Sequence, residues 1–255
     1  MNISLVLTVH NRHPEVSKQV ADSFLLAGNR VDEVVCVLDR PTEEVRTGAY
    51  AAWGGTPFKT RFIEIEGPPG WICPAKAWNR GYRAAMGDLL YCISSEVVQD
   101  AGNVELAKEL AAGGNTVIFG ACHNSVQTQL VVGAEPGLLA SSKMPRPLGF
   151  IACLPRAAVL AIGGADEAFQ DGLWFEDDDF YLRLWQSGLD FVWDDRIHGT
   201  HLDHERPDLM TDEGRDKVNI NAALMLRKHG TRYPWPQLPK VVESSPGRLA
   251  WRHLG

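Results

Sequence analysis

The sequence lacks the features that mark several large classes of protein. Its 255 residues carry a formal net charge of -7 at pH 7, so positive charge is not in excess. A broad basic surface for duplex nucleic acid or anionic lipid is therefore not expected. No run approaches the roughly 18 apolar residues that a membrane-spanning helix needs, and the first residues lack the layout of a signal peptide. We expect a cytoplasmic protein without a transmembrane segment.

Cysteine is scarce and unsuited to a disulfide framework. The five cysteines are odd in number, and no two form a C-x-x-C motif. Cys36 and Cys92 lie within apolar runs, which is typical of small core residues. This usage favours a reducing compartment.

Two nucleotide-binding motifs are also missing. The chain has neither G-x-G-x-x-G nor G-x-x-x-x-G-K-[ST], which counts against a dinucleotide-dependent dehydrogenase and a P-loop enzyme. It has no internal repeat and no low-complexity tract. Hydrophobic residues make up 45% of the chain, enough for one large core.

Short apolar runs alternate with segments of helical periodicity through the first hundred residues. This alternation predicts an α/β fold with a doubly wound, mostly parallel central sheet flanked by helices. In such sheets ligands bind beyond the carboxyl ends of the strands. The predicted strands are 3–9, 34–38, 58–65 and 89–93, and the predicted helices are 16–26, 42–53 and 74–86.

The second half continues with mixed elements. Residues 198–204 are interpreted as a polar loop, and a proline- and tryptophan-rich tail from Tyr233 as an irregular wrap. We expect the stretch 126–147 and the tail to shape the acceptor side of any site. The predicted strands are 116–120, 149–154 and 191–193, and the predicted helices are 104–112, 157–162, 180–185 and 211–229.

An acidic run, Glu176 to Asp179, is the most prominent polar motif. One interpretation is a solvated helix start, because acidic side chains favour a helix N-terminus. Bulky apolar residues on both sides of the run favour a cleft instead. A carboxylate at the edge of an apolar cleft suits a general base.

Histidines follow the acidic run after one helix and one short strand. His198 and His201 form an H-x-x-H pattern, and His204 lies just beyond. Imidazole nitrogens at such spacing can ligate a divalent metal. The alternative is a hydrogen-bonded surface pair.

Two acidic residues stand at the ends of predicted strands. Asp39 ends the second strand, where an aspartate can bind ribose hydroxyls or a base edge; an ordinary turn residue is the alternative. Glu96 closes the triplet Ser94-Ser95-Glu96 after the fourth strand, where a metal–diphosphate could bind. The alternative there is a helix cap, which serine favours.

These motifs, taken in order from residue 3 to 204, resemble the inverting family 2 glycosyltransferases and their GT-A relatives. The matching segments are 5–12 (LVLTVHNR), 34–39 (VVCVLD), 77–87 (AWNRGYRAAMG), 163–169 (GGADEAF) and 175–188 (FEDDDFYLRLWQSG). The resemblance implies the GT-A, Rossmann-like fold and a metal-assisted enzyme of hexosyltransferase type. Its donor would be a nucleotide sugar, most simply a UDP-sugar.

The resemblance also implies roles for individual residues. Asp177 takes the position of the general base, with Glu176 as the second catalytic candidate. Mn²⁺ or Mg²⁺ would lie on Glu96, His198 and His201, with His201 able to replace His198 as a ligand. The donor contacts implied are Thr8, His10, Asn11, Arg12, Asp39, Asn79 and Ser95.

One position departs from the family pattern. The family has Asp-x-Asp where this chain has Ser94-Ser95-Glu96. Glu96 can replace the second, metal-binding aspartate, but Ser94 brings no charge. A non-catalytic nucleotide-sugar-binding relative and a nucleotidyltransferase therefore remain alternatives.

The resemblance divides the chain into a catalytic domain and a tail. Residues 1–205 form the GT-A domain, with 1–100 as the nucleotide-binding half and 101–205 as the acceptor and catalytic half. Residues 206–255 form a helix and a Pro/Trp-rich tail packed on that domain. The acceptor hydroxyl could belong to a glycan, a protein, a lipid-linked intermediate or a modified nucleic-acid base. Trp174, beside the acidic run, is a candidate surface for stacking an acceptor sugar, whereas Trp185 is expected in the core.

Overall fold

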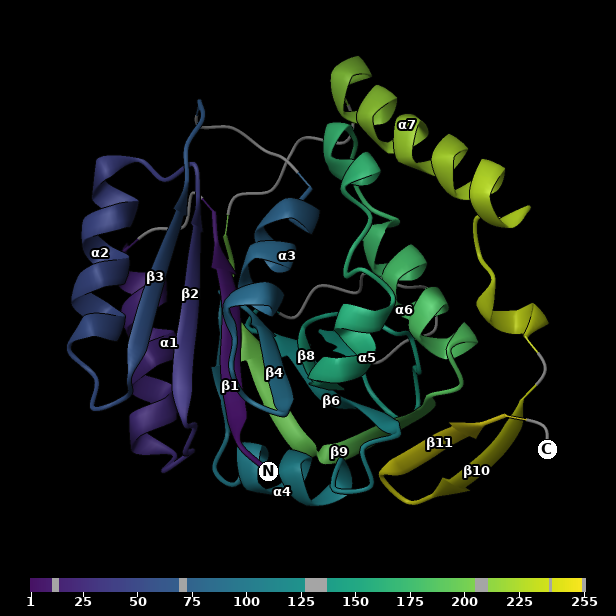
Figure 1. Cartoon of the computed structure of the whole chain (residues 1–255), viewed down its shortest axis with the longest axis horizontal. Coiled ribbons are helices and arrows are strands. Elements are labelled where there is room, and N and C mark those ends of the chain that lie inside the picture. Colours follow the sequence, from purple (N-terminus) through teal and green to yellow (C-terminus); the bar gives the residue numbers. More distant parts are fainter. Residues whose placement is uncertain (11–13, 69–72, 127–136, 205–210, 239, 254–255) are drawn as a thin grey trace.

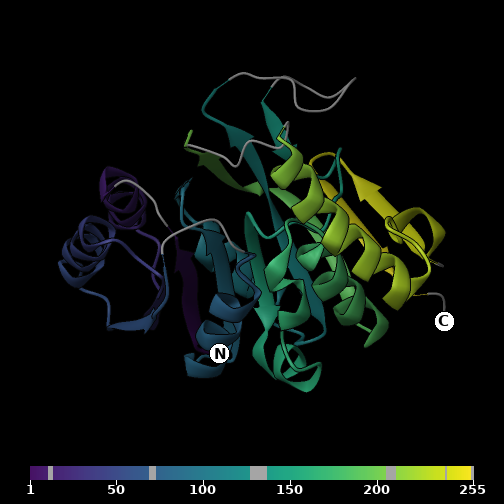
Figure 2. The same ribbon diagram turned by 90° about the horizontal axis from the view of Figure 1, so that it is seen from above.

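A mixed β-sheet runs through the middle of the molecule and is covered by helices on both faces (Figures 1 and 2). The computed structural model describes residues 1–10, 14–68, 73–126, 137–204, 211–238 and 240–253. Asn11 and Arg12, two of the predicted donor contacts, lie outside the described residues.

Within the described residues the sheet has eleven strands, and nine of them follow one another in the order β10-β11-β9-β6-β8-β4-β1-β2-β3. Apart from β8 and β11, these nine strands all point in the same direction, as their pairings require. The short strands β5 and β7 pair antiparallel with β9 and β6. The strands are β1 (Ile3–Val9), β2 (Glu33–Asp39), β3 (Thr60–Ile65), β4 (Leu89–Ser94), β5 (Val97–Gln99), β6 (Thr116–Asn124), β7 (Leu138–Ala140), β8 (Ile151–Pro155), β9 (Asp190–His201), β10 (Val241–Ser245) and β11 (Arg248–Arg252).

The helices form the two outer layers. α1 and α2 pack together on one face, and α3, α5, α6 and α7 cover the other (Figure 2). The α-helices are α1 (Pro14–Leu26), α2 (Glu43–Gly54), α3 (Ala75–Ala84), α4 (Asn103–Leu110), α5 (Arg156–Ala161), α6 (Glu176–Gln186) and α7 (Asp212–His229); η1 (Glu167–Asp171) and η2 (Trp235–Gln237) are 3-10 helices. Among the described residues, no helix combines the length and the apolar character needed to span a bilayer.

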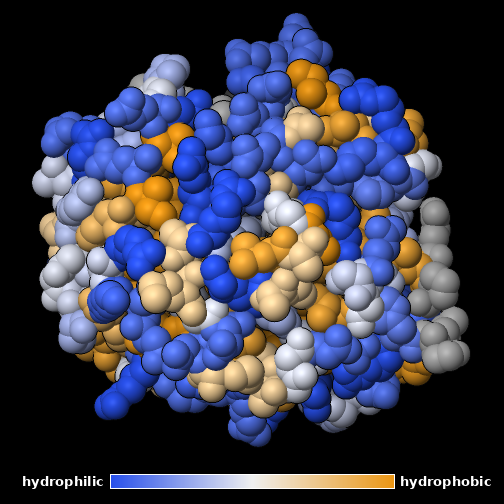
Figure 3. All heavy atoms as spheres, in the orientation of Figure 1, coloured by the Kyte–Doolittle hydropathy of each residue, from blue (hydrophilic) through white to orange (hydrophobic). Residues whose placement is uncertain are grey.

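The central strands are buried on both faces, and this explains their unbroken apolar sequences. All seven residues of β1 and of β2 are buried. Successive side chains of a strand point to opposite faces, so Val6 joins the core cluster under α3 and α6, while Leu5 and Leu7 join the cluster under α1 and α2. The α/β fold class is therefore confirmed. On the face seen in Figure 3, hydrophobic areas are small and separated by hydrophilic ones.

All five cysteines are buried and free, and Cys36 and Cys92 lie in the core as expected. Burial raises the pKa of the Cys36 thiol well above its ordinary value. These thiols therefore stay protonated at neutral pH and contribute to packing.

Two sequence-based expectations in the second half are wrong. The predicted polar loop 198–204 is a strand as far as His201, because β9 stays paired with β6 from Thr116 to Asn124. The predicted irregular tail contains the hairpin β10–β11, which adds to the sheet beside β9. The polar residues of 198–201 are not typical of a buried strand, and the prolines of the tail are not typical of a hairpin. Trp251 of β11 is nevertheless only 5% exposed. The proposed boundary at residue 205 stays a prediction.

Candidate active site at the carboxyl edge of the sheet

The carboxyl ends of five strands bring the candidate residues to one edge. β1, β2, β4, β6 and β9 all point the same way, so the residues at their ends share that edge. His10 follows β1, Asp39 ends β2, Glu96 follows β4, and His201 ends β9. This is where a doubly wound sheet binds its ligand.

Asp39 is the buried acid at the β1–β2 end of this edge. Asp39 is 5% exposed and lies 3.3 Å from the guanidinium of Arg40. His10 Nδ1 lies 2.9 Å from the Asp39 carbonyl oxygen. Thr8, on the neighbouring strand, is in register with Val37 of β2. Thr8, His10 and Asp39 thus lie on or just after two adjacent strands at this edge, and donor contact by them stays a prediction.

Arg40 is a residue of this corner that the sequence interpretation left out. Its φ is 51°, in the left-handed region that few non-glycine residues adopt. Its side chain lies so close to Gly67 that a Cβ there would be 2.4 Å from Arg40 Cδ. Arg40 is thus held between Gly67 and the buried Asp39.

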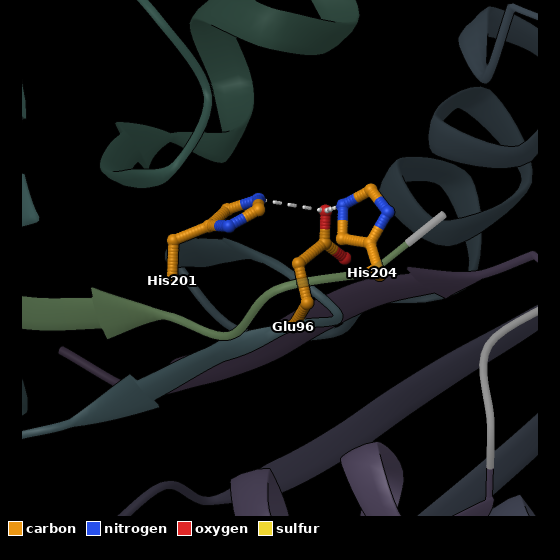
Figure 4. A group of neighbouring side chains, drawn as sticks. All are labelled: Glu96, His201 and His204. Atoms are coloured by element: carbon orange, nitrogen blue, oxygen red, sulfur yellow. Dashed lines mark ion pairs between the residues drawn. The ribbon is translucent and has the colours of Figure 1, made fainter. Parts of the chain in front are cut away.

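Glu96, His201 and His204 form a compact group of metal-ligating side chains. One ligand atom from each lies within 4.8 Å of the others. The Nε2 atoms of both histidines lie 3.3 Å from Glu96 Oε1, so the carboxylate sits between the two rings (Figure 4). Ser95 donates a hydrogen bond of 2.9 Å to the other oxygen, Glu96 Oε2. Ser95 therefore orients the Glu96 carboxylate, and this hydrogen bond is its link to the group.

The chemistry of this group fits a divalent cation. One carboxylate oxygen and two imidazole nitrogens suit Mn²⁺, Zn²⁺ and similar ions. The three side chains are at most 10% exposed, so the carboxylate is largely shielded from water. His201 Nδ1 is buried without a hydrogen-bond partner among the described residues, so the ring is anchored by packing, including an edge contact with Phe150.

His198, predicted as a ligand, lies elsewhere. It is three residues from His201 on the same strand, and an odd spacing puts the two side chains on opposite faces. Its Nδ1 lies 2.8 Å from Asp100 Oδ2, and its Nε2 lies 2.9 Å from His123 Nδ1. His204 takes the place in the group that the sequence interpretation gave to His198. Because residues 198–204 were interpreted as a loop, the H-x-x-H pattern did not indicate that His198 and His201 point to opposite faces of a strand.

Asn79 is likewise engaged away from the carboxyl edge. Its amide group accepts a hydrogen bond from Ala165 N and donates to the Ala165 carbonyl oxygen, each at 2.8 Å, and it donates to Glu167 at 2.9 Å. With 3% exposure and both amide atoms used, Asn79 joins α3 to the segment after α5. Donor contact by Asn79 stays a prediction that these bonds do not favour.

The acidic run separates into two structural and two available carboxylates. Asp179, fully buried, lies within 2.8 Å of Arg183, Lys228 and His229. Burial acts to raise the pKa of Asp179, but Lys228 and the other partners outweigh it and lower that pKa. Asp178 accepts a hydrogen bond of 2.6 Å from the Trp235 indole.

Glu176 and Asp177 form no ion pair within the described part of the chain. Burial, then the charge of Asp178, raises the pKa of Asp177, against the opposing effects of the Gly149 amide and Arg146. Burial and the charge of Asp177 raise the pKa of Glu176 as well. Carboxyl groups with raised pKa values and no cationic partner are typical of acid–base sites.

A short segment connects the acidic run to the metal-ligand group. Gly149 N lies 3.5 Å from Asp177 Oδ2. The next residue, Phe150, accepts a hydrogen bond from Ser94 N through its carbonyl oxygen and packs its ring against His201. Asp177 and the Glu96 group therefore flank the same two residues.

Comparison with known proteins identifies the fold. No protein-family model and no curated protein matches the chain. Among solved structures, the mannosyltransferase PcManGT from Pyrobaculum calidifontis, in complex with GDP-Man and Mn²⁺, matches 89% of this chain with a TM-score of 0.61 at 14% identity. TarS from S. aureus, residues 1-349 with UDP-GlcNAc, matches 89% with a TM-score of 0.60 at 13% identity. GalNAc-T7 with UDP, GalNAc and Mn²⁺ matches 89% with a TM-score of 0.58 at 14% identity.

These neighbours are GT-A glycosyltransferases, and the chain has the GT-A fold. It spans 64%, 67% and 50% of the lengths of the three neighbours. The predicted fold is thereby confirmed, while activity and site roles have to be argued from the chain's own residues.

Proposed function

We propose that this protein is a family 2-like, inverting glycosyltransferase that transfers a sugar from a nucleoside diphosphate sugar to an acceptor hydroxyl. The observation that carries the proposal is the grouping of Glu96 with His201 and His204 at the carboxyl edge of a GT-A sheet. Asp39 lies at the nucleotide end of that edge, and Asp177 is joined to it through Gly149. The nucleotide-sugar and Mn²⁺ complexes of the structural neighbours support the same donor class.

The donor would lie across the strand ends. His10, Asp39 and Arg40 would hold the nucleoside, and Glu96, His201 and His204 would hold Mn²⁺ or Mg²⁺ at the diphosphate. When bound, such a cation supplies positive charge to a leaving diphosphate. A UDP-sugar is the simplest donor.

Asp177 would act as the general base. It would accept the proton of the acceptor hydroxyl as the hydroxyl oxygen bonds to the anomeric carbon and the nucleoside diphosphate leaves with the bonding electron pair. One displacement inverts the anomeric configuration. Glu176, with its raised pKa, would stay protonated longer and limit the negative charge beside the base. General-base assistance contributes about 10²–10⁴-fold to the rate.

Calorimetric titration of UDP and GDP, with and without Mn²⁺, tests the donor site. We expect metal-dependent binding of at least one of them, followed by release of free nucleoside diphosphate from a panel of UDP-, GDP- and TDP-sugars. Failure of every nucleoside diphosphate to bind, with or without metal, would contradict the proposal. Pyrophosphate release would indicate a nucleotidyltransferase, and binding without turnover a non-catalytic relative.

Asp177→Asn tests the base. We expect donor binding within about twofold of wild type and turnover reduced by about 10²–10⁴-fold. Turnover of the wild-type protein should rise as pH increases through the raised pKa of Asp177, above the value near 3.9 of an ordinary aspartate. Wild-type turnover in the variant would show that another group is the base.

A further inference from the structure

Trp174 is an exposed tryptophan at the entrance to the acidic run. Its side chain is 58% exposed, whereas Leu173 and Phe175 on either side are at most 8% exposed. Trp185, in the same region of sequence, is 3% exposed and lies in the core as expected. An exposed indole offers a ligand both an apolar ring face and a polar N–H.

The backbone holds Trp174 in a costly conformation. Trp174 and Phe175 have φ values of 63° and 66°, in the left-handed region. Such a conformation is costly for a residue with a side chain and persists only where the surroundings fix it, commonly at functional sites. The backbone conformation at Trp174 and Phe175 therefore fixes the exposed position of this indole.

Helix α7 supplies the surroundings that fix it. Asn221, fully buried, donates hydrogen bonds of 2.9 Å to the carbonyl oxygens of Trp174 and Phe169. Leu173 N donates to the Lys217 carbonyl oxygen at 3.0 Å. At Gly172, a Cβ would be 2.3 Å from Asn221 Oδ1, so only glycine allows this close approach. In Figure 1, α7 lies beside the segment that leads into α6.

A hollow of about 280 Å³ lies between this tryptophan and α7. Trp174, Arg215, Val218 and Asn219 line it. An aromatic face with a guanidinium and an amide beside it matches a sugar ring, which has apolar C–H faces and a rim of hydroxyls. The hollow can hold a ligand of about the size of one sugar ring.

One residue that lines the hollow, Trp174, is close in the chain to the proposed base. Trp174 is three residues before Asp177, so their Cα atoms are at most about 11 Å apart. That span corresponds to about two sugar rings. A ring stacked on Trp174 could thus belong to the molecule whose hydroxyl reaches Asp177.

We propose that Trp174, with Arg215 and Asn219 of α7, forms an acceptor subsite that binds a carbohydrate ring. Among the acceptor classes considered, this selects a glycan or a glycosylated molecule. The inference rests on the proposed function for its role in transfer. Its binding chemistry can be tested without turnover.

Saturation-transfer NMR with simple methyl glycosides of glucose, galactose, mannose and N-acetylglucosamine tests the subsite. We expect at least one glycoside to bind wild-type protein at millimolar concentration, and Trp174→Ala to weaken that binding by about tenfold or more, with Trp174→Phe intermediate. Tyr50→Ala is the matched control, because Tyr50 is an exposed aromatic residue (42%) on α2, in the other helical layer.

Binding of none of the four glycosides by wild type, or equal binding by Trp174→Ala, would overturn the subsite. Thermal unfolding of each variant shows whether it is folded. UDP and GDP titrations on the same samples separate the two proposals. Loss of glycoside binding in Trp174→Ala with nucleotide binding intact supports an acceptor subsite. Absence of nucleotide binding in every sample contradicts the transferase proposal, and the glycoside titrations then test the carbohydrate subsite by themselves.

Discussion

At the scale of single residues, neighbouring acids in one run have opposite roles. Asp179 is surrounded by cationic partners and its pKa is lowered, whereas Asp177 forms no ion pair among the described residues and burial raises its pKa against the opposing charge of Arg146. The first arrangement stabilises the charged form in the folded state. The second carries an electrostatic cost in the folded state, and carboxyl groups with raised pKa values cluster at functional sites.

This contrast predicts stability changes of opposite sign. Asp177→Asn removes a charge that the folded state disfavours, so we expect a gain of about 1 kcal/mol, or roughly 2–4 °C in Tm, at pH 7–8. The gain should vanish near pH 4, because an acid with a raised folded-state pKa lowers stability only as pH rises above its unfolded value. Thermal unfolding across pH measures it, and a gain that persists at pH 4 would contradict the electrostatic cause.

Asp179→Asn should act in the other direction. It leaves Arg183, Lys228 and His229 facing a neutral group, and removing one partner of a buried ion pair costs about 3–5 kcal/mol. The loss should be full at neutral pH and shrink as pH falls through the lowered pKa of Asp179. Urea unfolding measures it; a change below 1 kcal/mol would show that the cluster contributes little.

The metal-ligand group gives a second prediction at this scale. We expect His201→Ala and Glu96→Gln to weaken Mn²⁺-dependent nucleoside diphosphate binding by more than about tenfold. His198→Ala is the matched control on the same strand and should bind like wild type, because His198 faces Asp100 and His123. Loss of binding in the His198 variant alone would restore the original assignment.

At the scale of elements, α3 is fixed to the segment after α5 through Asn79. The backbone of Ala165 bonds both atoms of the Asn79 amide, and Gly164 approaches it so closely that a Cβ would be 2.2 Å from Asn79 Oδ1. Segments 77–87 and 163–169, two of the segments that carry the resemblance, therefore contact each other in this chain. Their contact joins α3 to the residues after α5.

Two adjacent glycines allow a controlled test of this joint. Gly163 and Gly164 have φ values of 80° and 79°, but a Cβ on Gly163 would have no atom within 4 Å. Alanine at either position carries the left-handed cost of about 1–2 kcal/mol. Gly164→Ala should lose at least about 1 kcal/mol more because of the clash with Asn79. Equal losses of unfolding free energy for the two variants would show that Asn79 can move away from a Cβ at position 164 at no cost in stability.

At the scale of the whole molecule, the C-terminal residues complete the sheet. Strand β11 pairs with β9, and Trp251 packs against Trp193 and Trp235 at ring separations of 4.6 and 6.2 Å. The hairpin shares the core with α6, so it is expected to unfold together with the rest of the chain.

Trp251→Ala tests this continuity. Removing a buried tryptophan should cost about 3–5 kcal/mol while the urea transition stays a single step. Val242→Ala on the exposed strand β10 (53% exposed) is the control and should change stability by less than about 0.5 kcal/mol. A small loss for Trp251→Ala, or two separate transitions, would indicate an independent tail.

The sequence by itself determined the α/β class, the order of the first seven elements and the carboxyl edge of the sheet as the place for a site. Those features depend on local periodicity and on the direction of parallel strands, which neighbouring residues specify. Asp39 and Glu96 were placed at that edge for this reason, whereas Asp177 came from the acidic run and the resemblance; the roles of all three stay predictions. Only the tertiary structure decided which histidines join Glu96, which acids of the run are neutralised, and that the tail enters the sheet. Each of these depends on partners far away in the chain, such as His229 beside Asp179 and β6 beside β9, and local pattern carries no information about them.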